Sequence, residues 1–115
     1  YEEAAEAAAL GEVSRRALWG AFRIARSSGA AERCLEIATR LTAESPDPYA
    51  WIEIAKYHEH KRRDFARALA AAKAALDIAR TSGCLTAPAK ARLEREISHR
   101  IARLERKAGH DGSPY

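Results

Sequence analysis

The chain is poor in the residues that mark several other classes of protein. Among its 115 residues there are no Met, two Cys, six Gly and four Pro, and only 7% are aromatic. Two cysteines cannot build a disulfide framework, which favours a reducing, cytoplasmic setting. No uncharged apolar run approaches the ~20 residues that a membrane-spanning helix needs, so we predict no membrane partner. Because Met is absent, Tyr1 is not a translation start, and we expect a longer protein.

The residues that are abundant favour helices. Hydrophobic residues make up 47% of the chain, enough to close a core, and charged residues of both signs make up 31%. Apolar residues recur at steps of three and four, and no stretch alternates strictly, so we predict no strands. A short helical turn over residues 2–9 is left open. Turn signals divide the rest into five expected helices, at residues 12–26, 31–43, 48–61, 65–79 and 89–107.

The expected helix boundaries carry the chemistry of caps and turns. Asp47 and Asp64 each precede a helix, and we expect their carboxylates to accept hydrogen bonds from the first N–H groups of that helix. Gly29 suits the turn between the first two helices, and Gly83 follows the fourth, where we expect a left-handed residue. Helices joined by such short links pack antiparallel, as hairpins.

The two hairpins align with each other at an offset of about 33 or 34 residues, which is typical of a helical solenoid. On their first helices, Leu18, Ala21, Phe22 and Ala25 correspond to Trp51, Ile54, Ala55 and His58. The pattern resembles tetratricopeptide repeats (TPRs) and rests on Trp51, Ala55, Asp64-Phe65, Ala68, Ala75, Gly29 and Pro46. It departs from TPRs at Phe22, where a small residue is usual, and in the second turn, which lacks a Gly.

These patterns predict an all-α fold. We expect a TPR-like superhelix of two antiparallel helical hairpins plus a C-terminal capping helix, which together occupy residues 12–108. An N-terminal segment at 1–11 would precede it, and a flexible tail at 109–115 would follow. The residues expected to supply most of the core are Leu18, Phe22, Leu35, Trp51, Ile54, Phe65, Leu69, Leu76, Leu93, Ile97, Ile101 and Leu104.

A narrower resemblance comes from the stretch 53–60, followed by Arg63-Asp64-Phe65 and Ala68-Leu69. It is similar to the C-terminal TPR-like region of a family of bacterial RNase H-like exonuclease proteins. The resemblance implies that a carboxylate-dependent nuclease domain lies upstream. No Asp-x-Glu pair occurs in this chain, so none of that family's nuclease carboxylates maps onto it. We therefore predict that this segment has no catalytic residue and binds no metal or cofactor.

One face of the first helix and one face of the third combine cations with aromatic rings, because residues three, four and seven apart share a helix face. The first helix contributes Arg16, Trp19, Arg23 and Arg26, and the third contributes Tyr49, Ile52, Lys56, Glu59 and His60. The TPR resemblance implies that these residues line a concave groove. Such a surface suits carboxylates or phosphates. We expect a non-catalytic scaffold that binds a protein, a peptide or its own upstream domain. The alternatives are a solvated face, with Trp19 packed on the N-terminal segment, or a groove filled by the chain itself.

The fifth expected helix is amphipathic. Its apolar side carries Leu93, Ile97, Ile101, Leu104 and Ala108 and is expected to cover the last repeat. The opposite side carries Arg92, Arg95, His99, Arg103 and Arg106. Of these, the four arginines are candidate contacts to nucleic acid, and a solvated face is the simpler alternative. The second functional hypothesis is therefore a nucleic-acid-positioning C-terminal domain of an RNase H-like exonuclease.

Other motifs carry weaker signals. Lys61-Arg62-Arg63 with Arg67 forms a basic cluster in a turn, which we interpret as a solvated loop. His58 and His60 point about 200° apart on a helix, so they cannot hold one metal ion together. Cys34 occupies a position that repeats fill with a small residue and is expected to be buried, whereas Cys84 lies in a loop.

Overall fold

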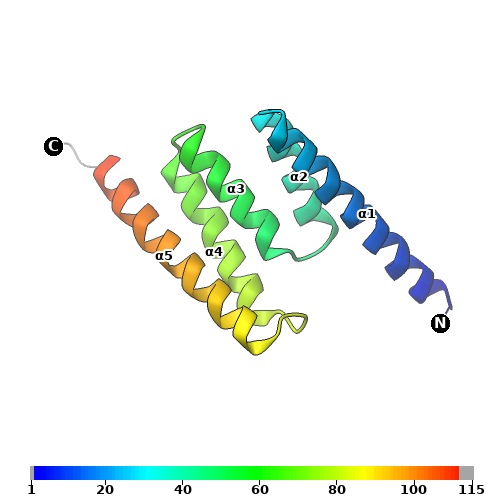
Figure 1. The fold of residues 1–115 in the computed structure, drawn as a ribbon. Coiled ribbons are helices and arrows are strands. Elements are labelled where there is room, and N and C mark those ends of the chain that lie inside the picture. The colour runs from blue at the N-terminus through cyan, green and yellow to red at the C-terminus, as the bar shows by residue number, and fades with distance from the viewer. Residues whose placement is uncertain (1, 112–115) are drawn as a thin grey trace. The chain divides into compact units, whose positions relative to one another are not determined.

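A computed structural model describes the backbone of residues 2–111 and the side chains of residues 11 and 13–109. Over residues 2–111 the regular structure is helical, with no strand, which confirms the all-α prediction (Figure 1). The chain divides into two compact units, Tyr1–Pro46 and Asp47–Tyr115. The helices are α1 (Glu2–Ser27), α2 (Ala31–Glu44), α3 (Pro48–His60), α4 (Phe65–Thr81) and α5 (Ala87–Asp111).

The first and last helices are longer than predicted. α1 runs without interruption from Glu2, so residues 2–11 are part of this helix and not a separate segment. This stretch is rich in Ala and Glu, which have high helix propensity. α5 continues to Asp111, so the tail does not begin at residue 109 as expected. Gly109 lies within the helix, although glycine is unfavourable there. Residues 112–115 lie outside the described residues.

Unit 1 is an antiparallel hairpin of α1 and α2. Gly29 adopts a φ of 75° in the turn, which confirms its predicted role. The Ala30 N–H then donates to the Ala25 carbonyl at 2.9 Å and closes the end of α1. Among the described side chains of this unit, the buried ones are Phe22, Ala25, Ile37, Ala38 and Leu41. Leu18 and Leu35, which were expected in the core, are only half-buried.

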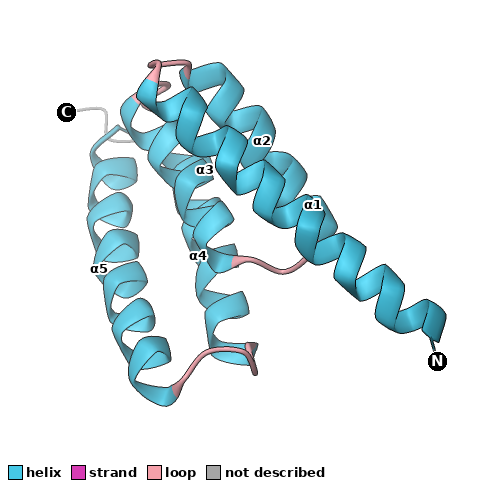
Figure 2. Ribbon diagram, turned by 45° about the vertical axis from the view of Figure 1, so that its right-hand side comes forward, coloured by secondary structure: helices cyan, strands magenta, loops and turns pink. Residues whose placement is uncertain are grey.

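Unit 2 has three helices: α3 and α4 form a second hairpin, and α5 packs along α4 (Figure 2). Small side chains on α4 allow a close approach, and Ala75 and Ala79 form a core cluster with Leu93 and Ile97 of α5. Ile54, Phe65 and Leu104 are also buried. Four other residues that we placed in the core are only half-buried, namely Trp51, Leu69, Leu76 and Ile101.

Both predicted aspartate caps are present in unit 2. One Asp47 carboxylate oxygen accepts from the N–H of Tyr49 at 3.0 Å and of Ala50 at 3.4 Å. The Asp64 carboxylate accepts from the Arg67 N–H at 3.1 Å. These bonds satisfy N–H groups that have no partner within the helix.

The prediction of a left-handed Gly83 was wrong. α4 ends at Thr81, and the next residue, Ser82, is extended with a φ of −70° and a ψ of 124°, so the chain leaves the helix without a left-handed residue. The turn between α3 and α4 instead contains Arg63 with a φ of 51°. A non-glycine residue pays roughly 1–2 kcal/mol for this conformation.

Candidate functional site

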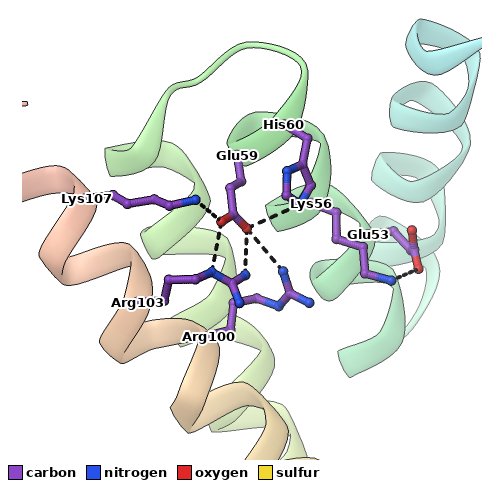
Figure 3. Close-up of polar contacts among 7 residues, drawn as sticks. All are labelled: Glu53, Lys56, Glu59, His60, Arg100, Arg103 and Lys107. Atoms are coloured by element: carbon purple, nitrogen blue, oxygen red, sulfur yellow. Dashed lines mark hydrogen bonds and ion pairs between the residues drawn. The ribbon is translucent and has the colours of Figure 1, made fainter.

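A single buried carboxylate on α3 gathers three cations from α5. Glu59 is 1% exposed. Its Oε2 accepts from Arg103 Nε at 3.0 Å and Lys107 Nζ at 2.8 Å, and its Oε1 accepts from Arg103 Nη2 at 2.9 Å and Arg100 Nη1 at 3.2 Å (Figure 3). The three donors share a face of α5 because they lie three and four residues apart. The cluster therefore ties the last turn of α3 to α5.

The charges around Glu59 determine its protonation. Burial by itself raises the pKa of the Glu59 carboxyl, but the hydrogen bonds and positive charges of Arg103 and Lys107 outweigh burial and lower it from 4.5 to about 2. At neutral pH the group is an ionised carboxylate already bound by cations, so it cannot serve as a general acid. Three cations around one carboxylate leave two positive charges in excess.

The face of α3 that was expected to line a groove is partly covered within unit 2. Ile52 packs against the core cluster formed by α4 and α5. Lys56 Nζ lies 3.2 Å from Glu53 Oε1, and His60 Nε2 lies 3.6 Å from Glu59 Oε1. Tyr49 is 48% exposed. α3 therefore presents Tyr49, Lys56 and His60 to solvent to differing degrees, while Ile52 serves packing.

The predicted face of α1 is more open. Arg16, Arg23 and Arg26 are exposed, and the half-buried Trp19 meets the Phe22 ring edge-on, with centroids 5.4 Å apart. Arg26 Cζ lies 5.6 Å from the Phe22 centroid, within cation–π range. All of these residues belong to unit 1.

A shallow hollow adjoins this face. It has a volume of about 430 Å³ and is lined by Arg23, Ile24, Ser27 and Ser28. Ile24 is 73% exposed, which is unusual for a large aliphatic side chain. A cation and an apolar side chain thus stand next to each other on the open side of α1.

The basic side of α5 is divided by the structure. Arg92, Arg95, His99 and Arg106 are exposed, as expected for a solvent-facing side. Arg103 was assigned to the same side, but its guanidinium binds Glu59 through two nitrogens. Arg103 lies three residues after Arg100 and four before Lys107, and these three side chains share the face of α5 that binds Glu59.

Among the described residues, the remaining histidines and cysteines do not form a recognisable catalytic or metal site. Burial lowers the pKa of His58, with Asp64 opposing and Arg67 and Arg62 reinforcing that effect, and its buried Nδ1 has no hydrogen-bond partner. Cys34 is half-buried and Cys84 exposed.

Over the described part of the chain, no three His, Cys, Asp or Glu residues are grouped to hold a metal ion. No helix within that part has the length and apolarity to cross a bilayer.

Sequence reasoning missed the role of Glu59. Helical periodicity put Glu59 on the same stripe of α3 as Ile52, seven residues earlier, and that stripe was interpreted as a groove. A signal for its burial was present on α5, where Arg100, Arg103 and Lys107 border the apolar side at helical spacing. Recognising that signal requires knowing which helix covers which face.

The chain matches no protein-family model, and comparisons with curated proteins and with solved structures find no similar protein. Any functional proposal therefore rests on the chain's own residues.

Proposed function

We propose that this chain is a non-catalytic, TPR-like interaction module that binds an acidic protein segment on α1 of unit 1. The observation that supports this function is the open arginine face of α1. Arg16 and Arg23 lie seven residues apart and so project from the same side, and Arg26 follows within one turn. Guanidinium groups form paired hydrogen bonds with carboxylates, which makes an acidic segment the matching ligand.

Aromatic packing prepares this face for binding. Trp19 is held against Phe22, and Arg26 lies over the Phe22 ring. Groups that are already ordered lose less conformational entropy when a ligand binds. The hollow beside Arg23, with the exposed Ile24, suits an apolar side chain next to the acidic residues. The preferred ligand is therefore an acidic segment that contains an aliphatic or aromatic residue.

The test uses a fluorescently labelled peptide of Asp and Glu residues around one Leu, with affinity measured by fluorescence anisotropy. We expect Arg23→Glu to weaken binding at least tenfold while the melting temperature changes by no more than about 3 °C, because exposed substitutions have small effects on stability. The matched control is Arg40→Glu, which makes the same charge change at an exposed position of α2. An equal loss in both variants, or none in Arg23→Glu, would contradict the proposal.

A second candidate function is the positioning of nucleic acid for an RNase H-like nuclease domain upstream. The exposure of Arg92, Arg95 and Arg106 on α5 favours it. Because phosphate contacts release counterions, this function predicts binding of single-stranded RNA or DNA that falls steeply with added salt. Absence of binding at about 50 mM salt would remove this candidate. In either case we propose that the module works in the cytoplasm.

A further inference from the structure

The turn between α3 and α4 forms a small hollow with the end of α5. Its volume is about 360 Å³, and it is lined by Arg62, Arg63, Asp64, Phe65, Ala66 and Ala108. All of these residues belong to unit 2, whereas the α1 face belongs to unit 1. A volume of this size lies at the low end of the range for small-molecule sites.

Two cations are held at the hollow by the buried ring of Phe65. Arg63 Cζ lies 5.5 Å and Lys107 Nζ lies 5.4 Å from the ring centroid, both within cation–π distance. Lys107 Nζ also donates to Glu59 Oε2 at 2.8 Å. The Glu59 cluster and the aromatic ring thus fix the ammonium group before any ligand arrives.

The arginines of the turn are oriented as well. Arg62 Nε donates to the Tyr57 hydroxyl at 3.0 Å, and Arg62 Cζ lies 6.0 Å from the Tyr57 centroid. Arg63 adopts the left-handed φ of 51°, which a glycine would take without strain. Backbone strain at a charged residue lining a hollow is a common feature of ligand sites.

Two arginines and one carboxylate are among the residues that line this hollow. Asp64 is the carboxylate in its lining, but Asp64 Oδ2 lies 3.4 Å from Arg67 Nε and Asp64 Oδ1 accepts from the Arg67 N–H, so its charge is largely matched. Among the described side chains, the carboxylate of Glu59 binds Lys107 and is also bound by Arg100 and Arg103. Arg62 and Arg63 in the lining, together with Lys107 over the Phe65 ring, supply the cationic groups at this hollow.

We propose that this hollow binds the phosphate end of a small polyphosphate-type anion. Guanidinium and ammonium donors are the protein groups that recognise phosphate oxygens. Arg62 and Arg63 are neighbours at one small hollow and do not form an extended stripe, which favours a compact anion over a nucleic acid strand. The inference does not depend on the acidic-segment function assigned to α1.

Binding is tested on the full chain by NMR amide titration with inorganic pyrophosphate at about 50 mM salt. We expect saturable shifts in the amides of residues 62–66. The variant Arg63→Gly removes the guanidinium and also relieves the left-handed strain, so it should fold at least as well as the native chain. It should bind pyrophosphate at least tenfold more weakly. Arg92→Ala removes one exposed cation elsewhere on unit 2 and should leave the affinity unchanged.

Three results would overturn the proposal. They are an absence of shifts with millimolar pyrophosphate, an equal loss in Arg63→Gly and Arg92→Ala, or Arg63-dependent binding of a single-stranded oligonucleotide without binding of pyrophosphate. The acidic peptide and pyrophosphate test different units. Arg23→Glu should therefore leave pyrophosphate binding intact, so failure of one proposal is distinguishable from failure of the other.

Discussion

The two hairpins start from similar sequence patterns but differ in what covers them within their own units. Among residues 11 and 13–46, where side chains are described, the α1–α2 hairpin buries five hydrophobic side chains. The α3–α4 hairpin has a third helix against α4, and Leu93, Ile97 and Leu104 of α5 are buried there. An Ala-rich helix such as α4 has short side chains, so the large residues that fill its surroundings come from α5. The comparison shows that similar repeat patterns do not imply the same number of packed layers.

The charged residues of the two units also differ in how far they are buried. In unit 1, Arg33 and Glu36 form an exposed ion pair, and Arg16 and Arg23 extend into solvent. In unit 2, Glu59 is buried and holds three cations. Exposed pairs contribute little to stability, whereas breaking a buried cluster is costly. Unit 1 therefore has cations available for an acidic segment, while unit 2 uses several of its cations to join α3 and α5.

Shortening a buried side chain of α5 should have the largest effect. Ile97 is 0% exposed, and Ile97→Ala should lower the free energy of unfolding of unit 2 by about 2–5 kcal/mol. Urea denaturation and amide exchange in α3, α4 and α5 measure this loss. The matched control is Ile24→Ala in unit 1, which should change stability by less than about 0.5 kcal/mol because Ile24 is exposed. Similar losses in both variants would show that α5 is not packed as described.

Neutralising the buried carboxylate should have the next largest effect. Glu59→Gln keeps the shape of the side chain but leaves three cations without their counter-ion, which should cost roughly 3–5 kcal/mol. Glu36→Gln makes the same change in the exposed pair of unit 1 and should cost under about 0.5 kcal/mol. Urea denaturation at neutral pH compares the two. A cost below about 1 kcal/mol for Glu59→Gln would mean that the cluster does not stabilise unit 2.

Acid should weaken unit 2 through the same carboxylate. The folded pKa of Glu59 is about 2 and its ordinary value is 4.5, so the unfolded state binds the proton first as the pH falls. The stabilisation from Glu59 is complete above about pH 4.5 and is lost as the pH falls toward 2, a total of about 3 kcal/mol. The urea midpoint of the native chain should therefore fall more steeply over this range than that of Glu59→Gln. Parallel curves would contradict the assignment.

The helix caps should give the smallest effects and differ in sign between the units. Asp47 caps α3 through two hydrogen bonds, so Asp47→Ala should cost about 1 kcal/mol. The N-cap of α2 is Ala30, which makes no side-chain cap bond, so Ala30→Asp should stabilise unit 1 by about 0.5–1 kcal/mol. Thermal unfolding of both variants checks the signs. Destabilisation by Ala30→Asp would show that the α2 terminus cannot accept a cap.

The sequence predicted features that depend on neighbouring residues. The caps at Asp47 and Asp64, the turn at Gly29 and the apolar side of α5 follow from local chemistry and helical periodicity. Features that depend on tertiary packing were missed. The left-handed residue occurs at Arg63, in the turn between α3 and α4. It does not occur at Gly83, because the chain leaves α4 through the extended residue Ser82. Glu59 is bound by side chains that reach it from α5, and no local pattern around Glu59 predicts those partners.

The most direct test of the account is the pKa of Glu59, measured by NMR titration of its side-chain carboxyl carbon in the folded chain. The account predicts that this resonance stays at its ionised position through pH 4.5 and titrates with a midpoint of about 2. A midpoint near the ordinary value of 4.5 while unit 2 remains folded would contradict it, because Arg103 and Lys107 would then not be bound to the carboxylate.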